Sequence, residues 1–190
     1  MKYIFFIFLF FLYACTPNNK DWSSYGNDLF NQRFSDLDQI NTANIDQLDL
    51  AWQIQTGTKS SFQATPIVKD GVMYVSLPFN DVIALDGKTG QEIWRYKHDR
   101  NKDWPMCCGP ANRGLGIYKN QLFMGTVDAR LISLDIKTGN KIWDVNVVNN
   151  SVKTETIENL GATNPLKEDF VSGGTGVGMN MAPVIYNNKV

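Results

Sequence analysis

The chain has 190 residues, of which 43% are apolar and 19% charged, and its formal net charge is −1. This length predicts a single globular domain, and the balanced charge excludes a protein that binds nucleic acid mainly by electrostatic attraction. Hydrophobicity is concentrated at the start, where thirteen of the first fourteen residues are apolar. The remaining composition is typical of a soluble domain, which excludes a disordered chain and a protein with several membrane spans.

Residues 1–14 are predicted to form a secretory signal peptide. Lys2 precedes eleven apolar residues, Tyr3–Tyr13, whereas a membrane-spanning helix needs about 20. The segment ends in Ala14 followed by Cys15, which resembles a bacterial lipobox. On this interpretation Cys15 carries lipid and residues 15–20 form a polar tether. The folded part then lies in the periplasm, anchored to a bacterial membrane, with the outer membrane favoured. An ordinary signal peptide with an incidental cysteine is the alternative.

A sequence pattern repeats inside the chain. Thirteen residues beginning at Val82 recur without a gap from Leu131, at an offset of 49. Both copies contain Asp-x-Lys-Thr-Gly-x-x-x-Trp, ending in Trp94 and Trp143. Such internal repeats indicate a fold built from similar structural units.

A third copy begins near the end of the chain. Residues Ala182–Val190 match Thr65–Met73 at an offset of 117, so an insertion of about 19 residues separates this copy from the second. Residues 21–190 are therefore predicted to contain repeat units at about 62–110 and 111–178 and an incomplete unit at 179–190.

Each unit is predicted to form four short strands. In the first unit these are Ala64–Val68, Val72–Ser76, Asp81–Asp86 and Glu92–Lys97, separated by turn residues. Four-stranded units of this period are typical of β-propeller blades, so the expected fold class is an all-β propeller. We expect the Trp of each repeat to pack between adjacent blades, and Trp52 to do so from a strand that closes the ring.

The repeat register also predicts a polar site. Adding the two offsets to position 63 relates Gln63 to Asn112 and Asn180, each just before the first strand of its unit. Because the first strand of a propeller blade is innermost, these three amides are expected to surround one mouth of the central channel, beside Arg113. Amides and arginine are suitable donors to carboxylates and carbonyls. The alternative is that polar residues merely suit loops at the start of strands.

Several segments resemble the PQQ-dependent alcohol dehydrogenases. The repeated pattern is similar to the tryptophan-docking motif of quinoprotein propellers. Residues Asp21–Trp52 resemble the amino-terminal signature of the family, and Cys107–Leu115 resembles its adjacent-cysteine segment. The resemblance covers residues 21–190 and implies an eight-bladed propeller in the complete protein, with PQQ and a calcium or lanthanide ion as cofactors. It also implies that a primary alcohol or similar hydroxyl substrate is oxidised and that a periplasmic c-type cytochrome accepts the electrons.

The resemblance assigns roles to named residues. It implies a Cys107–Cys108 disulfide that lies flat against the quinone ring. Neighbouring α-carbons are about 3.8 Å apart, below the usual about 4.4–6.8 Å across a disulfide, so the bridge would close a strained ring. Two unbridged thiols, or disulfides to other chains, are the alternatives. Arg113 matches a cofactor-contacting arginine, with Gln63 and Asn180 as secondary contacts at positions where the family usually has Glu and often Thr.

The catalytic base and the metal ligands of the family are expected beyond Val190, so no residue of this chain is assigned to them. At 49 residues per unit, a ring of seven or eight blades needs about 350–400 residues. We therefore expect the chain to be the amino-terminal part of a larger enzyme, inactive alone. His98, the only histidine, is expected to be solvated.

Two rival functions remain open at the level of sequence. One is a cofactor-free propeller lipoprotein that acts as an outer-membrane assembly scaffold. The other is a degenerate relative that has lost its cofactor, which Gln63 in place of Glu favours. The adjacent cysteines and the Asp21–Trp52 signature argue for the enzyme, because a scaffold has no use for them.

Overall fold

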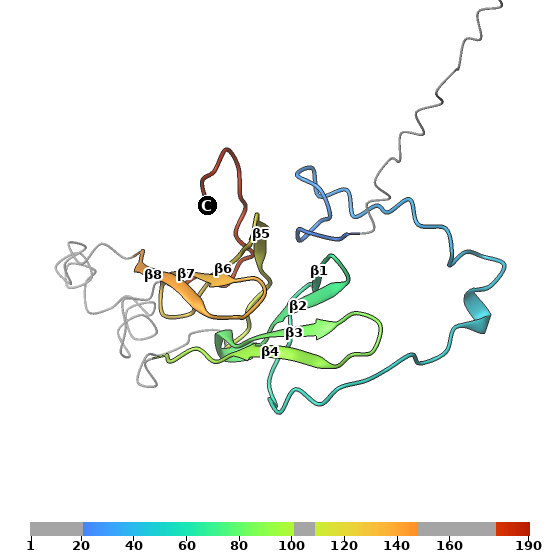
Figure 1. The fold of residues 1–190 in the computed structure, drawn as a ribbon, viewed down its shortest axis with the longest axis horizontal. Coiled ribbons are helices and arrows are strands. Elements are labelled where there is room, and N and C mark those ends of the chain that lie inside the picture. The colour runs from blue at the N-terminus through green and yellow to red at the C-terminus, as the bar shows by residue number, and fades with distance from the viewer. Residues whose placement is uncertain (1–20, 101–108, 148–177) are drawn as a thin grey trace, which may run out of the picture.

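The computed structural model describes residues 21–100, 109–147 and 178–190, which include two four-stranded antiparallel sheets (Figure 1). The first sheet comprises β1 (Ile67–Lys69), β2 (Val72–Ser76), β3 (Val82–Asp86) and β4 (Glu92–Tyr96). The second comprises β5 (Gly116–Tyr118), β6 (Gln121–Gly125), β7 (Arg130–Asp135) and β8 (Lys141–Asn146). The predicted signal peptide, the tether and the residues Cys15, Cys107 and Cys108 lie outside the described residues.

Each sheet is a simple meander in which every strand pairs with the next one along the chain. The pairing of β3 with β4 shifts register between Ala84 and Leu85, and that of β7 with β8 shifts between Ser133 and Leu134. These two irregularities are related by the repeat offset of 49 residues. The four predicted strands of the first unit are confirmed, although β1 begins at Ile67 and not at Ala64.

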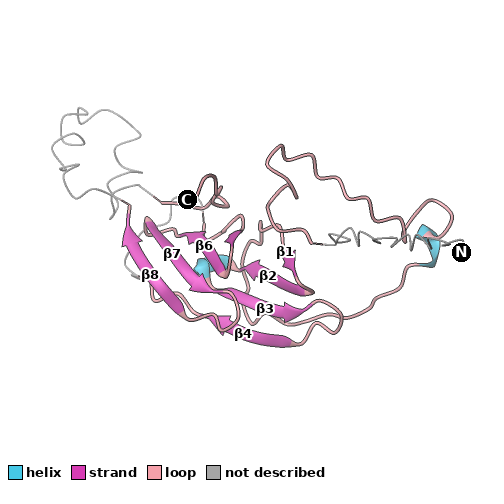
Figure 2. Ribbon diagram, turned by 45° about the horizontal axis from the view of Figure 1, so that its top comes forward, coloured by secondary structure: helices cyan, strands magenta, loops and turns pink. Residues whose placement is uncertain are grey.

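Helical structure is minor in the described ranges (Figure 2). Two short 3₁₀ turns are present. Turn η1 (Ile45–Gln47) lies in the segment that precedes β1, residues 21–66, here called the amino-terminal arm, and η2 (Pro78–Asn80) lies between β2 and β3. Neither turn has the length or hydropathy of a membrane-crossing helix. The arm itself touches the first sheet through Trp22, whose backbone N–H and C=O both bond to Val68, at 2.9 and 2.8 Å.

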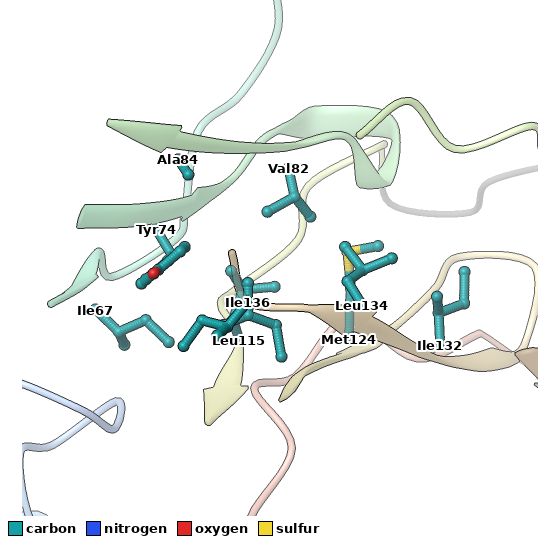
Figure 3. Close-up of a cluster of buried hydrophobic side chains, with 10 residues drawn as sticks. Ile67, Tyr74, Val82, Ala84, Leu115, Met124, Ile132, Leu134 and Ile136 are labelled. Carbon is teal, nitrogen blue, oxygen red and sulfur yellow. The ribbon is translucent and has the colours of Figure 1, made fainter. Parts of the chain in front are cut away.

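The main core lies between the two sheets (Figure 3). Ile67, Tyr74, Val82 and Ala84 from the first sheet meet a larger group from the second unit: Leu115, Leu122, Met124, Ile132, Leu134 and Ile136. On the opposite face of the first sheet, Leu77, Ile83 and Leu85 pack with Trp52 and Ile54. Strand β3 is therefore covered on both faces, which explains its continuous apolar run in the sequence.

The repeated Asp-x-Lys-Thr-Gly segments form identical turns. In the second unit, Asp135 Oδ1 accepts the backbone N–H groups of Lys137 and Thr138 at 3.0 and 2.9 Å and the Thr138 hydroxyl at 2.9 Å. The hydrogen bonds from Thr138 lower the pKa of the Asp135 carboxyl below its usual value. Gly139 completes the turn with a φ of +71°, a conformation that favours glycine.

Trp94 joins the first blade to the second through this turn. Its indole Nε1 donates to the Ile136 carbonyl at 3.1 Å. The ring lies so close to Gly139 that a Cβ added there would stand 2.5 Å from Trp94 Cε3. A side chain at Gly139 would therefore displace the indole, so the turn needs glycine for packing as well as for its φ angle.

Trp52 makes the same contact with the first blade. Its Nε1 donates to the Gly87 carbonyl at 3.2 Å, and a Cβ added at Gly90 would stand 2.5 Å from Trp52 Cε3. The predicted packing of tryptophan between units is thus confirmed for Trp52 and Trp94. The expected strand around Trp52 is not present, since the residues between η1 and β1 form no strand. Trp143 contacts Phe123 of its own blade, with ring centroids 5.8 Å apart.

The Trp94–Gly139 contact yields a stability prediction. We expect Trp94→Ala to lower the free energy of unfolding by about 3 kcal/mol, because it empties the space between two blades. Urea unfolding followed by circular dichroism measures the loss. Ile93→Ala on the same strand is the matched control, since Ile93 is 50% exposed. Equal losses in the two variants would contradict the role of Trp94 between the blades.

Candidate cofactor site

The starts of the three repeat units lie side by side. Gly114 stands between the other two starts: a Cβ added to it would lie 3.3 Å from Ala182 Cβ and 3.6 Å from the Thr65 carbonyl oxygen. Positions 65, 114 and 182 are the ones that the repeat offsets relate to each other. Gly114 has a φ of +138°, so glycine suits both the backbone and the space. The register inferred from the sequence is therefore confirmed for the backbone.

The inner strand of the second blade is packed as tightly. A Cβ added to Gly116, the first residue of β5, would lie 2.7 Å from the Pro183 carbonyl oxygen and would collide with the Ile185 side chain. Only a residue without a side chain fits there. The third unit consequently approaches the second backbone to backbone, which keeps the loops before both inner strands close together.

Arg113 and Asn180 are brought together by this packing. The Arg113 backbone N–H donates to the Asn180 carbonyl at 2.8 Å. The Arg113 side chain is exposed and has no ion-pair or hydrogen-bond partner among the described residues. Gln63, two residues before Thr65, is also exposed, and its amide has no hydrogen-bond partner in the described part of the chain. The predicted Cys107 and Cys108 contacts lie outside the described residues.

Asn112 differs from the sequence-based expectation. Its side chain was expected at the channel mouth, yet Asn112 is only 1% exposed. The amide Nδ2 donates to the Gly125 carbonyl at 2.8 Å, and Oδ1 accepts the Gly114 N–H at 2.9 Å. The expectation of a free amide at Asn112 is therefore wrong. Repeat arithmetic fixes the backbone position, whereas the short Asn side chain bonds to its own surroundings.

The first blade also contacts the loop before β5. The Phe79 N–H donates to the Pro110 carbonyl at 2.9 Å. The fully buried Asn80 donates from Nδ2 to the Gly125 carbonyl at 3.4 Å, and its Oδ1 accepts the Val127 N–H at 3.0 Å. Sequence reasoning missed Asn80. The sequence predicts turn residues between the second and third strands, but nothing in them indicates that the Asn80 amide bonds to the next blade.

His98 occupies the same boundary between blades. Its side chain is 3% exposed, and Nε2 lies 2.9 Å from Asp128 Oδ1. The expectation of a solvated His98 is wrong, because the chain after β4 brings the His98 ring against Asp128 of the second blade, while Asp81 Oδ1 of the first blade accepts the His98 N–H at 3.1 Å. Burial alone would raise the pKa of Asp128, but hydrogen bonds from His98 and Thr126 outweigh it and lower that pKa to about 2.

The described ranges contain no set of metal ligands, because no three His, Cys, Asp or Glu side chains come together there. What the described part supplies instead is a group of polar atoms at adjoining unit starts. One exposed cation, Arg113, and one exposed amide, Gln63, belong to that group, and the backbone around Arg113 is held by hydrogen bonds of the buried Asn112 side chain. Such an arrangement can bind an anionic or carbonyl-rich molecule.

The two sheets, their tryptophan docking and the convergent unit starts define a quinoprotein-type β-propeller. The family model for the PQQ-type glucose/ethanol/alcohol dehydrogenase β-propeller domain matches residues 22–190. The chain belongs to this family of PQQ-dependent alcohol dehydrogenases.

Individual relatives agree with this assignment. The chain is 38% identical over 168 residues to a quinohemoprotein alcohol dehydrogenase of Comamonas testosteroni, covering 87% of this chain and 23% of the relative. It is 36% identical over 158 residues to the 1-butanol dehydrogenase (cytochrome c) of Thauera butanivorans, covering 82% and 23%. The chain therefore spans about a quarter of the length of these relatives.

Solved structures show the same fold. The crystal structure of the Comamonas testosteroni quinohemoprotein alcohol dehydrogenase matches with a TM-score of 0.72 and 32% identity, over 92% of this chain and 23% of the other. A europium-containing methanol dehydrogenase matches with a TM-score of 0.64 and 34% identity, over 68% and 23%. The propeller architecture expected from the sequence is confirmed.

The His98–Asp128 pair yields a pH prediction. The folded-state pKa of Asp128, about 2, lies below its ordinary 3.8, so the pair stabilises the fold above about pH 4. This stabilisation is lost as the pH falls from about 4 to about 2. We expect His98→Gln to flatten this part of the pH profile of the unfolding midpoint in urea. Asp99→Asn, at the exposed neighbouring residue, is the control. An unchanged profile in His98→Gln would exclude the pair as its source.

Proposed function

We propose that this chain belongs to an exported PQQ-dependent dehydrogenase that oxidises a primary alcohol or a similar hydroxyl substrate. The observation that carries the proposal is Arg113, an exposed arginine without a partner among the described residues, beside Asn180 where the unit starts meet. The family membership and the alcohol dehydrogenases among the relatives support it. A periplasmic c-type cytochrome is the proposed electron acceptor, because one relative is named as cytochrome c-linked.

The residues in this chain fit PQQ. An acidic quinone presents carboxylates and carbonyls, and a guanidinium binds carboxylates through two parallel, charge-assisted hydrogen bonds. Arg113 would bind a carboxylate, while Gln63 and Asn180 would donate to carbonyl or carboxylate oxygens. Bound PQQ supplies a two-electron acceptor, whose quinone a calcium or lanthanide ion polarises.

The adjacent cysteines complete the proposed site. We propose that Cys107 and Cys108 form a disulfide that packs against the quinone. In support, the chain that follows them is anchored, since the Pro110 carbonyl accepts a hydrogen bond from Phe79 at 2.9 Å and Asn112 is buried. A short anchored segment joins the pair to Arg113, so both would face the same bound molecule.

Export and anchoring through lipid on Cys15 are part of the same proposal, which places the enzyme in the periplasm at a bacterial membrane. The alternative of a cofactor-free assembly scaffold is less favoured, because the relatives that cover most of this chain are dehydrogenases. Because the chain spans 23% of the length of those relatives, we propose that turnover needs the full-length protein and not this chain alone.

The activity is tested on the full-length protein that carries this sequence. We expect primary alcohols to reduce an artificial electron-accepting dye only after PQQ is added together with Ca²⁺ or a lanthanide ion. The dye absorbance measures the rate, and reactions without PQQ or without alcohol are the controls. Absence of both PQQ binding and alcohol-dependent reduction would contradict the proposal and favour the scaffold.

Arg113 is tested separately. We expect Arg113→Ala to weaken PQQ binding by about 10- to 150-fold, the equivalent of one charge-assisted hydrogen-bonding group worth about 1.5–3 kcal/mol. Titration of PQQ by its absorbance measures the dissociation constant. Lys137→Ala removes an exposed cation from the Asp-x-Lys-Thr-Gly turn and is the matched control. Equal affinities in Arg113→Ala and Lys137→Ala would exclude Arg113 as a cofactor contact.

A further inference from the structure

Gly125, at the end of β6, is a point where all three repeat units meet. Its carbonyl accepts hydrogen bonds from Asn112 Nδ2 at 2.8 Å and from Asn80 Nδ2 at 3.4 Å. Its α-carbon faces the third unit, because a Cβ added there would lie 2.7 Å from Met179 Cβ. The Gly125 peptide therefore contacts the loops that start both the second and the third unit.

Asn112 ties the backbone around Arg113 to this point. Besides its bond to Gly125, its Oδ1 accepts the Gly114 N–H at 2.9 Å, so the side chain closes a turn across Arg113. The Arg113 N–H is itself bonded to the Asn180 carbonyl at 2.8 Å. The peptide groups on both sides of Arg113 are thus fixed, while its guanidinium remains exposed and unpaired among the described residues.

The first unit lacks an equivalent pair of side-chain hydrogen bonds. The repeat offset of 49 relates Asn112 to Gln63 and Gly125 to Ser76. Gln63 is exposed without a hydrogen-bond partner in the described ranges, and no described side chain donates to the Ser76 carbonyl. Of these two units, only the one that carries the arginine has a buried amide bonded across the following residue. A general requirement of the blade would have produced the bond in both.

We propose that Asn112 is a positioning residue that directs the Arg113 side chain toward the cofactor, acting through the Gly114 N–H and the Gly125 carbonyl. This inference rests on the proposed function, since Asn112 would affect binding only through Arg113, a proposed cofactor contact. It assigns Asn112 no contact with the cofactor. Its effect on binding must therefore pass through Arg113, and this requirement makes the proposal testable by a double-mutant cycle.

The cycle measures PQQ affinity in the full-length protein for wild type, Asn112→Ala, Arg113→Ala and the double variant. We expect Asn112→Ala to weaken binding by about tenfold, the lower end of the loss expected for Arg113→Ala because the effect passes through Arg113, and to have no further effect once Arg113 is absent. A purely structural Asn112 would weaken binding equally in both backgrounds, and that result would overturn the inference. Thr138→Ala, which removes a comparable polar contact from a distant turn, is the matched control.

A second readout needs no cofactor. Amide hydrogen exchange of Arg113 and Gly114, measured without PQQ, is expected to rise in Asn112→Ala and to stay unchanged in Thr138→Ala. Should Asn112→Ala not fold, Asn112→Ser replaces it in both measurements. Unchanged exchange at Gly114 would overturn the inference, even if the protein binds PQQ. Failure of the wild type to bind PQQ would instead overturn the proposed function, with the exchange data still deciding whether Asn112 fixes the loop.

Discussion

The contact of a tryptophan ring with a glycine in the next unit sets the spacing of the blades. A single four-stranded sheet leaves apolar residues on both faces, so it becomes stable only when a neighbour covers them. Trp94 against Gly139 and Trp52 against Gly90 provide this cover at the outer edge, and each indole also donates a hydrogen bond to its neighbour. Because the outer edges are fixed in this way, the inner strands must meet at a constant distance.

The candidate site is a consequence of that spacing. Close approach of the unit starts and inner strands favours glycine at Gly114 and Gly116. Two buried amides, Asn80 and Asn112, satisfy the backbone groups that this close packing would otherwise leave unbonded. The Arg113 guanidinium and the Gln63 amide, by contrast, are exposed and have no partner among the described residues.

The repeat made most of this arrangement predictable. An offset of 49 residues located the strands, the docking tryptophans and the adjoining unit starts, because one backbone geometry recurs wherever the turn and core residues recur. It did not locate side chains whose bonds differ between units. Asn112 is buried where Gln63 is exposed, and His98 pairs with Asp128 of the next blade. Such contacts depend on distances between blades, about which the local sequence of either partner carries no signal.

The pairing of charged side chains is consistent with an anion-binding role for Arg113. Arg130 is paired with Asp144, Arg95 with Glu92, and the Asp128 carboxylate is hydrogen-bonded to His98. Arg113 alone stands where the unit starts converge without an acidic partner in the described ranges. A guanidinium in this position can form two parallel, charge-assisted hydrogen bonds with a carboxylate, which agrees with the place of Arg113 in the cofactor site proposed above.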